Sequence, residues 1–468
     1  MGLLALLNAE FQDATSIAAA VLDGRRSAVA VLREARERAE AHRADRAFIS
    51  EDWDAAFVHA ARVDAQIAAG EDPGPLAGVP VSVKDVIAVA GLPLTAASHV
   101  RDGDAPVRVS ATAVTRLLEA GAVVVGKTNC PEFAMGITCT SPVGGSTANP
   151  RFPGRTPGGS SGGEAASLAA GVTALGVGTD FGGSLRWPAQ CVGIAALRPG
   201  RGSVPGDGTV PGRGGSFGDD AVVPVPTLNM QGMLQVIGPM ARSIDDLRTA
   251  WRLMAGHPPV RHAVQSSTNE PLRVVWSDGS QIVPVRAEVT AMMGRLASRL
   301  RSAGHHVVED PAVFAGCLEA YNNQRSCDPM LDHASAVEGR QGLLGDEVRT
   351  MIADSLIHAS EHTQAMTRVA EAAALAALTV FDRADVVLLP VAGTPAASVD
   401  GEALIDGRPC EGWELMGLCR SVTLTGAPTV SLPVALSGEG WPLSIQVVTA
   451  PGREEFALDI ADLLESLN

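Results

Sequence analysis

Lysine is scarce in this chain, and one of its two positions has the features of a general base. Lysine and arginine together number 36, yet the lysines are only Lys84 and Lys127. Arginine stays protonated in proteins, whereas a lysine removed from water can release its proton. Lys84 ends the apolar run 79–83, where burial is expected; an ordinary charged residue at a strand end is the alternative interpretation. Lys127 is a candidate to orient Asp85 or another carboxylate.

A second candidate site is a block rich in serine and glycine, PGGSSGGEAASLAAG at 157–171 followed by ALGVGTDFGGSLRWPA at 174–189. Its glycines are interleaved with helix- and strand-forming runs, which indicates backbone that closely approaches another group rather than a linker. The GGSSG segment is not a nucleophile elbow, because three prolines in 149–157 replace the strand that must precede one. The glycines from Gly176 to Gly182 do not fit a dinucleotide site, because Pro188 follows and no acidic residue is placed for a ribose.

From Gly158 to Ala189 the block matches, position by position, the long pattern of the amidase signature family, and the chain resembles that family. Four other stretches are similar to family segments: PVSVKDV at 80–86, GKTNCPEFAMG at 126–136, GPMARS at 238–243 and GAPTVSLP at 426–433. The resemblance covers about residues 10–465. Fixed spacing over some thirty residues makes this a specific match.

The resemblance implies an α/β fold of one compact domain over residues 1–468, in which α-helices cover both faces of a twisted mixed β-sheet. It divides the chain into N-terminal helices at about 15–70, a signature core at about 76–245 and a variable helical region for the substrate pocket at about 311–380.

Hydrophobic periodicity places many elements independently of the resemblance. It predicts helices at 27–42, 52–69, 111–120, 164–170, 243–254 and 287–303, and mostly helical structure from 317 to 377. It predicts strands at 79–87, 122–126, 172–177, 385–390, 429–434 and 443–448. The segment 207–230, rich in glycine and proline, is interpreted as a long loop that covers a site.

The resemblance also implies a catalytic set. The family's nucleophile corresponds to Ser184, and its base corresponds to Lys84. The family also has a bridging serine held by a cis peptide bond, which corresponds to Ser160. Neutral Lys84 would take the proton of Ser160, which takes that of Ser184 during attack on the amide carbonyl. The same relay would return a proton to the departing amine. The family's oxyanion donors are backbone N–H groups, which here belong to Phe181, Gly182, Gly183 and Ser184.

This chemistry sets conditions on the neighbouring residues. For Lys84 to be neutral near pH 7, its pKa must fall from about 10.4 by about three units, which requires burial without a paired carboxylate. Asp85 is therefore expected to point away, since strand neighbours face opposite sides. We expect Asp180 to hold the loop and Arg186 to pair with a buried carboxylate or carbonyl groups. Ser161 either hydrogen-bonds backbone near the site or simply forms a turn.

Composition disfavours several classes of protein. A net charge of −16 would repel nucleic acids and anionic membranes. The apolar stretch 2–7 lacks the basic residues of a signal peptide and is too short to span a membrane, so we expect a cytoplasmic enzyme. The seven cysteines and ten histidines form no metal-binding pattern, and we expect no metal and no cofactor. The expected partners are a small-molecule amide and, in a homodimer, a second copy of the chain.

The favoured function is hydrolysis of a small-molecule carboxamide through an acyl-enzyme on Ser184. One alternative is the A subunit of a glutamyl-tRNA amidotransferase, although the acidic chain and a 203–230 segment without the tyrosine-containing stretch typical of that protein argue against it. A second is an acyltransferase, and a third is a binding module on an inactive scaffold. Candidate pocket residues come from the least family-like segments, and their character favours an apolar or aromatic acyl group: Phe217, Tyr321, Met330, Trp413 and Met416.

Overall fold

A mixed β-sheet of eleven strands forms the centre of the molecule in the part of the chain that the computed structural model describes, residues 2–211, 229–258, 270–357, 361–410 and 412–467. The strand order is β1-β3-β2-β6-β8-β7-β14-β15-β11-β9-β10. The strands are β1 (Phe48–Glu51), β2 (Pro80–Lys84), β3 (Val123–Thr128), β6 (Leu175–Asp180), β7 (Ala195–Arg198), β8 (Val236–Ala241), β9 (Arg273–Trp276), β10 (His306–Glu309), β11 (Val386–Pro390), β14 (Thr429–Leu436) and β15 (Pro442–Val448).

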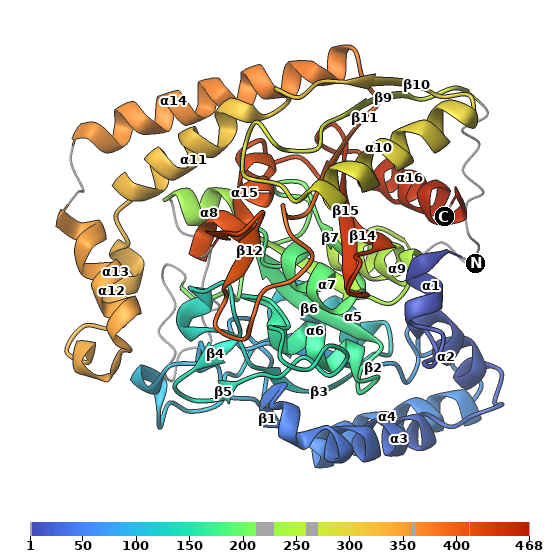
Figure 1. Ribbon diagram of the computed structural model, residues 1–468. Helices are drawn as coiled ribbons and strands as arrows, with labels where there is room; N and C mark the ends of the chain where they lie inside the picture. The colour runs from blue at the N-terminus through green and yellow to red at the C-terminus, as the bar shows by residue number, and fades with distance from the viewer. Residues whose placement is uncertain (1, 212–228, 259–269, 358–360, 411, 468) are drawn as a thin grey trace.

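Helices surround this sheet (Figure 1). They are α1 (Leu3–Leu7), α2 (Ala14–Leu22), α3 (Ala28–Ala41), α4 (Trp53–Ala68), α5 (Thr112–Glu119), α6 (Gly162–Ala169), α7 (Arg186–Val192), α8 (Met230–Leu234), α9 (Ile244–Ala255), α10 (Ala287–Ser302), α11 (Ala315–Cys327), α12 (Leu331–Ala336), α13 (Asp346–Ile357), α14 (Glu361–Leu378), α15 (Gly417–Leu424) and α16 (Glu454–Leu467). Two short hairpins, β4 (Thr140–Ser141) with β5 (Gly145–Ser146) and β12 (Ala403–Ile405) with β13 (Arg408–Cys410), lie outside the sheet.

Alternation along the strands separates two apolar layers. In β7, Ala196 packs with the apolar residues of α6 and α7, such as Leu168. Its neighbour Leu197 belongs to the main core, together with Leu247 of α9 and Leu458 of α16. Because successive strand residues face opposite sides, helices cover both faces of the sheet. The predicted α/β architecture is confirmed.

Most of the predicted elements are present, with boundaries shifted by a few residues. Ser27 caps α3 as expected, since its side chain accepts the N–H of Ala30 at 3.1 Å. The strand predicted at 172–177 begins at Leu175 and runs to Asp180 as β6. The periodicity missed five strands of the sheet. β1, β9 and β10 have four residues each and pair at or next to its edges, whereas β7 and β8 lie between β6 and β14 in its interior. Residues 212–228 of the predicted loop 207–230 lie outside the described residues.

The two ends of the described chain lie on the same side of the molecule (Figure 1). The backbone N–H of Ala5 in α1 donates to the carboxylate of Glu465 in α16 at 3.0 Å. Within the described ranges, no helix combines the length and the apolar character needed to cross a membrane.

The packing of α6 against the sheet predicts the effect of substituting Gly163. A Cβ at this position would lie 2.5 Å from Asn129 O and 2.6 Å from Ala47 O, both of them backbone atoms that cannot rotate away. We expect Gly163→Ala to lower the free energy of unfolding by about 1–3 kcal/mol, the usual cost of overpacking. Urea denaturation measures this change. Gly294→Ala is the control, because a Cβ in α10 meets no described atom within 4 Å; it should be neutral or stabilise slightly.

Candidate active site

Neighbouring parallel strands bring the candidate residues to one edge of the sheet. Lys84 is the last residue of β2 and Asp180 the last residue of β6, and Val83 lies opposite Val177 in the parallel register of these two strands. Ser160 directly precedes Ser161, the N-cap residue of α6. Ser184 lies in the turn between β6 and α7. The carboxyl ends of such strands are where open α/β sheets form ligand crevices.

Lys84 is fully buried, with 0% exposure, and its hydrogen-bond partners are hydroxyl groups. Its Nζ lies 2.6 Å from Ser160 Oγ and 2.9 Å from Thr179 Oγ1. Burial lowers the pKa of Lys84 to about 8, although nearby Asp180 and Glu164 act in the opposite direction. Within the described ranges, no carboxylate forms an ion pair with Lys84. The amine therefore has the environment that a neutral lysine requires.

Asp85 points away from Lys84, as the strand alternation predicted. Its Oδ1 lies 3.0 Å from Nζ of Lys127 on β3, and both side chains are completely buried. The side chain of Thr95 and the backbone N–H of Ala97 also donate to Asp85 Oδ2. The two lysines thus have separate environments: Lys127 neutralises a buried carboxylate, and Lys84 faces hydroxyl groups.

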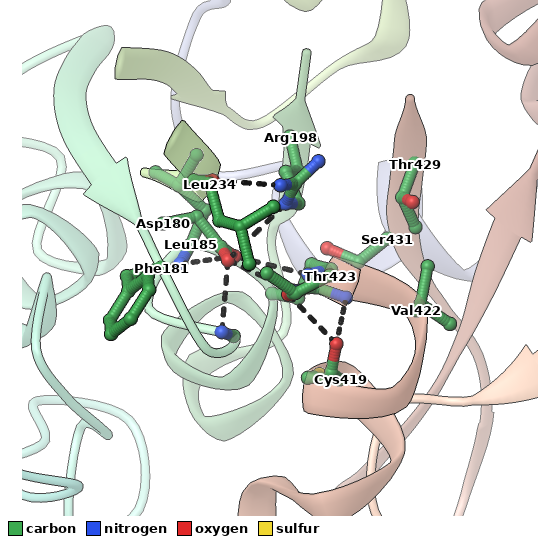
Figure 2. A network of polar contacts seen from close by, with 12 residues as sticks. Asp180, Phe181, Leu185, Arg198, Leu234, Cys419, Val422, Thr423, Thr429 and Ser431 are labelled. Atoms are coloured by element: carbon green, nitrogen blue, oxygen red, sulfur yellow. Dashed lines mark hydrogen bonds and ion pairs between the residues drawn. The ribbon is translucent and has the colours of Figure 1, made fainter. Parts of the chain in front are cut away.

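The turn that carries Ser184 is held by a buried ion pair of Asp180 with Arg186. Figure 2 shows Asp180 within the surrounding network of polar contacts. Asp180 accepts the backbone N–H groups of Gly183 and Leu185 at 2.9 and 3.1 Å. It also accepts Nε and Nη2 of Arg186 at 3.0 and 2.8 Å, and Arg198 Nε lies 3.6 Å away. Burial alone would raise the pKa of Asp180, but Arg186 and Arg198 outweigh it and hold this pKa at about 2. The structure thus brings Asp180 and Arg186 together in the arrangement expected from the sequence.

Arg186 connects this turn to the C-terminal part of the chain. Its remaining donors bond to the carbonyl oxygen of Cys419, the side chain of Thr423 and the side chain of Gln446, at 2.9, 2.7 and 2.6 Å. Cys419 and Thr423 belong to α15 (Figure 2). All five N–H donors of the guanidinium are therefore used.

Ser160 and Ser184 line the same cavity and are nearly buried, with exposures of 1% and 7%. The peptide bond between Gly159 and Ser160 is cis. Among the described residues, no hydrogen bond joins the two serine hydroxyls. Their segments are connected through the backbone, since the N–H of Ser161 donates to the carbonyl oxygen of Ser184 at 3.3 Å. Ser161 Oγ donates to the carbonyl oxygen of Thr179 at 3.3 Å, so its side chain contacts backbone beside the site.

One of the four predicted oxyanion donors needs correction. The N–H of Gly183 already donates to Asp180 and is not available to a substrate. Gly183 has φ +122°, and a Cβ there would lie 2.6 Å from Cys419 Cβ, so the turn requires glycine for its shape. The N–H groups of Phe181, Gly182 and Ser184 have no acceptor in the described part of the protein.

The cavity beside Ser184 has a volume of about 240 Å³ and includes three of the predicted pocket residues, Tyr321, Trp413 and Met416. The prediction for Met330 is wrong: it is buried in the core beside α11 and does not line the cavity. Phe217 lies outside the described residues. Within the described ranges, no three His, Cys, Asp or Glu side chains gather as metal ligands.

A family model described as Amidase matches residues 30–458. The chain belongs to the amidase family. The resemblance of the serine–glycine block to the amidase signature is thereby confirmed.

Several known proteins are similar to this chain. The A subunit of glutamyl-tRNA(Gln) amidotransferase from Synechococcus sp. (strain RCC307) is 30% identical over 452 residues, which cover 89% of each chain. Indoleacetamide hydrolase of Bradyrhizobium diazoefficiens is 28% identical, with 87% of this chain and 76% of the relative covered. A solved amidase crystal structure superimposes with a TM-score of 0.84 at 29% identity, covering 97% of this chain and 99% of the other.

Four residues near the site were not predicted from the sequence. Thr179 hydrogen-bonds to Lys84. Glu164 accepts hydrogen bonds from the side chains of Ser82 and Thr128. Arg325 and Arg420 line the cavity. Burial raises the pKa of Glu164 to about 7. The position of Glu164 in the serine–glycine block was an available signal, whereas nothing distinguished the two arginines from the many others.

The buried pair of Lys127 and Asp85 predicts a large effect on stability. Lys127→Met would leave the Asp85 carboxylate buried without its cation, and the free energy of unfolding should fall by about 3–5 kcal/mol. Urea unfolding followed by circular dichroism measures this loss. Arg408→Gln is the matched control, since its partner Glu414 is at the surface and such pairs contribute about 0–1 kcal/mol. Equal stability of the two variants would contradict the role assigned to Lys127.

Proposed function

We propose that this chain hydrolyses a small-molecule carboxamide through an acyl-enzyme on Ser184. The observation that carries the proposal is the buried amine of Lys84, which is hydrogen-bonded to Ser160 and has no carboxylate in an ion pair within the described residues. A lysine in this setting can accept a proton near neutral pH. Membership of the amidase family supports the same reaction class.

The proton path runs from Ser184 to Ser160 and on to Lys84. Ser184 Oγ attacks the amide carbonyl as its proton moves to Ser160, whose own proton moves to Lys84. The C–N bond then breaks, and Lys84 returns the proton through Ser160 to the departing nitrogen. Water repeats the sequence on the acyl-enzyme and releases the acid. The hydrogen bond between the two serines must form when substrate binds, which is common for catalytic contacts.

Charge that develops on the carbonyl oxygen needs donors at the same place. The N–H groups of Phe181, Gly182 and Ser184 supply them in this proposal, and Gly183 shapes the turn. Removing one such donor typically costs about 3–4 kcal/mol of transition-state stabilisation. The ion pair of Asp180 with Arg186 positions these groups before the reaction begins.

A second candidate function is that of the A subunit of an amidotransferase, because a relative with that name is 30% identical over 89% of this chain. Under this alternative the chain works with partner proteins, and by itself it should hydrolyse amides poorly. Steady hydrolysis of simple amides by the purified single chain excludes it. A requirement for added partner proteins would instead support it.

The nucleophile is tested by Ser184→Ala. We expect kcat to fall by about 10⁴-fold or more, because the variant lacks the hydroxyl that attacks the amide carbonyl. Labelling by a fluorophosphonate should disappear in the same variant, while circular dichroism stays unchanged. Ser161→Ala is the control in the neighbouring segment and should keep labelling. Labelling of the Ser184→Ala protein at wild-type rate would reject Ser184 as nucleophile.

The base is tested by the pH dependence of kcat/KM together with Lys84→Arg. The active form is the neutral amine and the pKa of Lys84 is about 8, so kcat/KM should rise about tenfold per pH unit below 8 and level off above it. In Lys84→Arg the side chain is still cationic, but a guanidinium does not release its proton, so activity should be nearly absent from pH 6 to 9. A pH-independent wild-type rate between pH 6 and 9, or an active arginine variant, would exclude Lys84 as the base.

A further inference from the structure

The charged side chains that line the cavity beside Ser184 have the same sign in the described part of the chain. Among the described residues that line it, the charged ones are Arg325 of α11 and Arg420 of α15, and no aspartate or glutamate is present. The other polar side chains include the neutral amides of Gln231 and Asn322. Such a lining favours an anion over a neutral or cationic ligand.

Arg420 lies directly against the turn that precedes the nucleophile. A Cβ on Gly182 would be 3.4 Å from Arg420 Cγ and 3.6 Å from its Nε. The guanidinium carbon lies 4.5 Å from the ring centre of Trp413 and 5.5 Å from that of Tyr321. These aromatic contacts fix the planar group at the cavity wall, where its N–H donors can reach a bound molecule.

Arg420 lacks the partners that a half-buried guanidinium usually has. Its Nη1 donates to Asn322 Oδ1 at 3.3 Å, whereas its Nε is buried without an acceptor in the described structure. No carboxylate in the described ranges pairs with it. Burial lowers the pKa of Arg420; Tyr321 acts in the opposite direction, and the nearby charge of Arg325 lowers this pKa further.

Arg325 also lines the cavity. Its guanidinium carbon lies 5.8 Å from the ring centre of Phe181, and its Nη2 lies 3.3 Å from Sδ of Met330, a weak acceptor. It forms no ion pair with a described carboxylate. Arg186, by contrast, uses all five donors on protein acceptors. Arg325 and Arg420 therefore differ from the structural arginines of this site.

We propose that the physiological substrate is a small amide that carries a carboxylate, bound by Arg420 and Arg325 while its carbonyl group faces Ser184. This assignment rests on the proposed amidase function. Guanidinium groups bind carboxylates through charge-assisted, often paired hydrogen bonds. The cavity of about 240 Å³ is at the small end of ligand pockets, which favours a short chain between the amide and the carboxylate.

The test compares amides that differ only in charge. Succinamate and glutaramate carry a carboxylate, and succinamide and glutaramide have a neutral amide in its place. We expect kcat/KM of the wild-type protein to be about 10- to 100-fold higher for each anionic member, mainly through KM. Comparable rates for the charged and neutral members would overturn the proposal.

The variants assign the preference to the two arginines. Arg420→Gln and Arg325→Gln should each reduce the ratio of kcat/KM between the anionic and neutral amides by about tenfold, and Arg420→Lys should reduce it less. Arg408→Gln is the control for the loss of one positive charge, because Arg408 pairs with Glu414 and does not line the cavity. In this variant the ratio of kcat/KM between the anionic and neutral amides should not change. An unaltered ratio in Arg420→Gln would also overturn the proposal.

A binding measurement separates this inference from the proposed function. Calorimetry of succinate with the Ser184→Ala protein should show binding that weakens about tenfold or more when Arg420→Gln is added. If no amide is hydrolysed and Ser184 is not labelled, the proposed function fails, while succinate binding still reports on the arginines. If neutral amides are hydrolysed well and succinate does not bind, the function stands and the carboxylate assignment falls.

Discussion

The separation of two adjacent ionisable side chains, those of Lys84 and Asp85, is the constraint on which the candidate site depends. The sheet is buried at this point, so neither side chain reaches water, and strand alternation directs them to opposite faces. Lys127 on the neighbouring strand neutralises Asp85 at 3.0 Å. Lys84 is thereby left with hydroxyl partners. If Asp85 instead faced Lys84, the ion pair would favour the protonated amine and remove the proposed general base.

The turn that carries Ser184, the proposed nucleophile, depends on a second buried charge, that of Asp180. One carboxylate accepts two backbone N–H groups of the turn and two donors of Arg186, whose other contacts reach α15. The N–H of Gly183 is occupied because the hydrogen bond that shapes the turn uses it. The same network attaches the turn of Ser184 to the helix that carries Arg420. The C-terminal segment thus shares in positioning the serine and in lining the cavity.

Much of the fold and the central part of the site could be predicted from the sequence, for identifiable reasons. Lys84, Ser160 and Ser184 stand in motifs whose spacing is fixed, and long periodic segments such as α3 and α10 have strong helical patterns. Short edge strands such as β10 bury little and have no clear alternation. Thr179 and Arg420 were missed because their roles arise from contacts between segments distant in sequence. The occupied N–H of Gly183 depends on side-chain geometry that no sequence pattern records.

The acidity of the whole chain does not conflict with a cavity that binds anions. A net charge of −16 is spread over a large surface, and at physiological salt the Debye length is about 8 Å. Distant carboxylates are therefore largely screened from a ligand beside Ser184, whereas Arg325 and Arg420 act at contact distance. For a small anion inside the cavity, the nearby guanidinium groups of Arg325 and Arg420 determine the strength of binding.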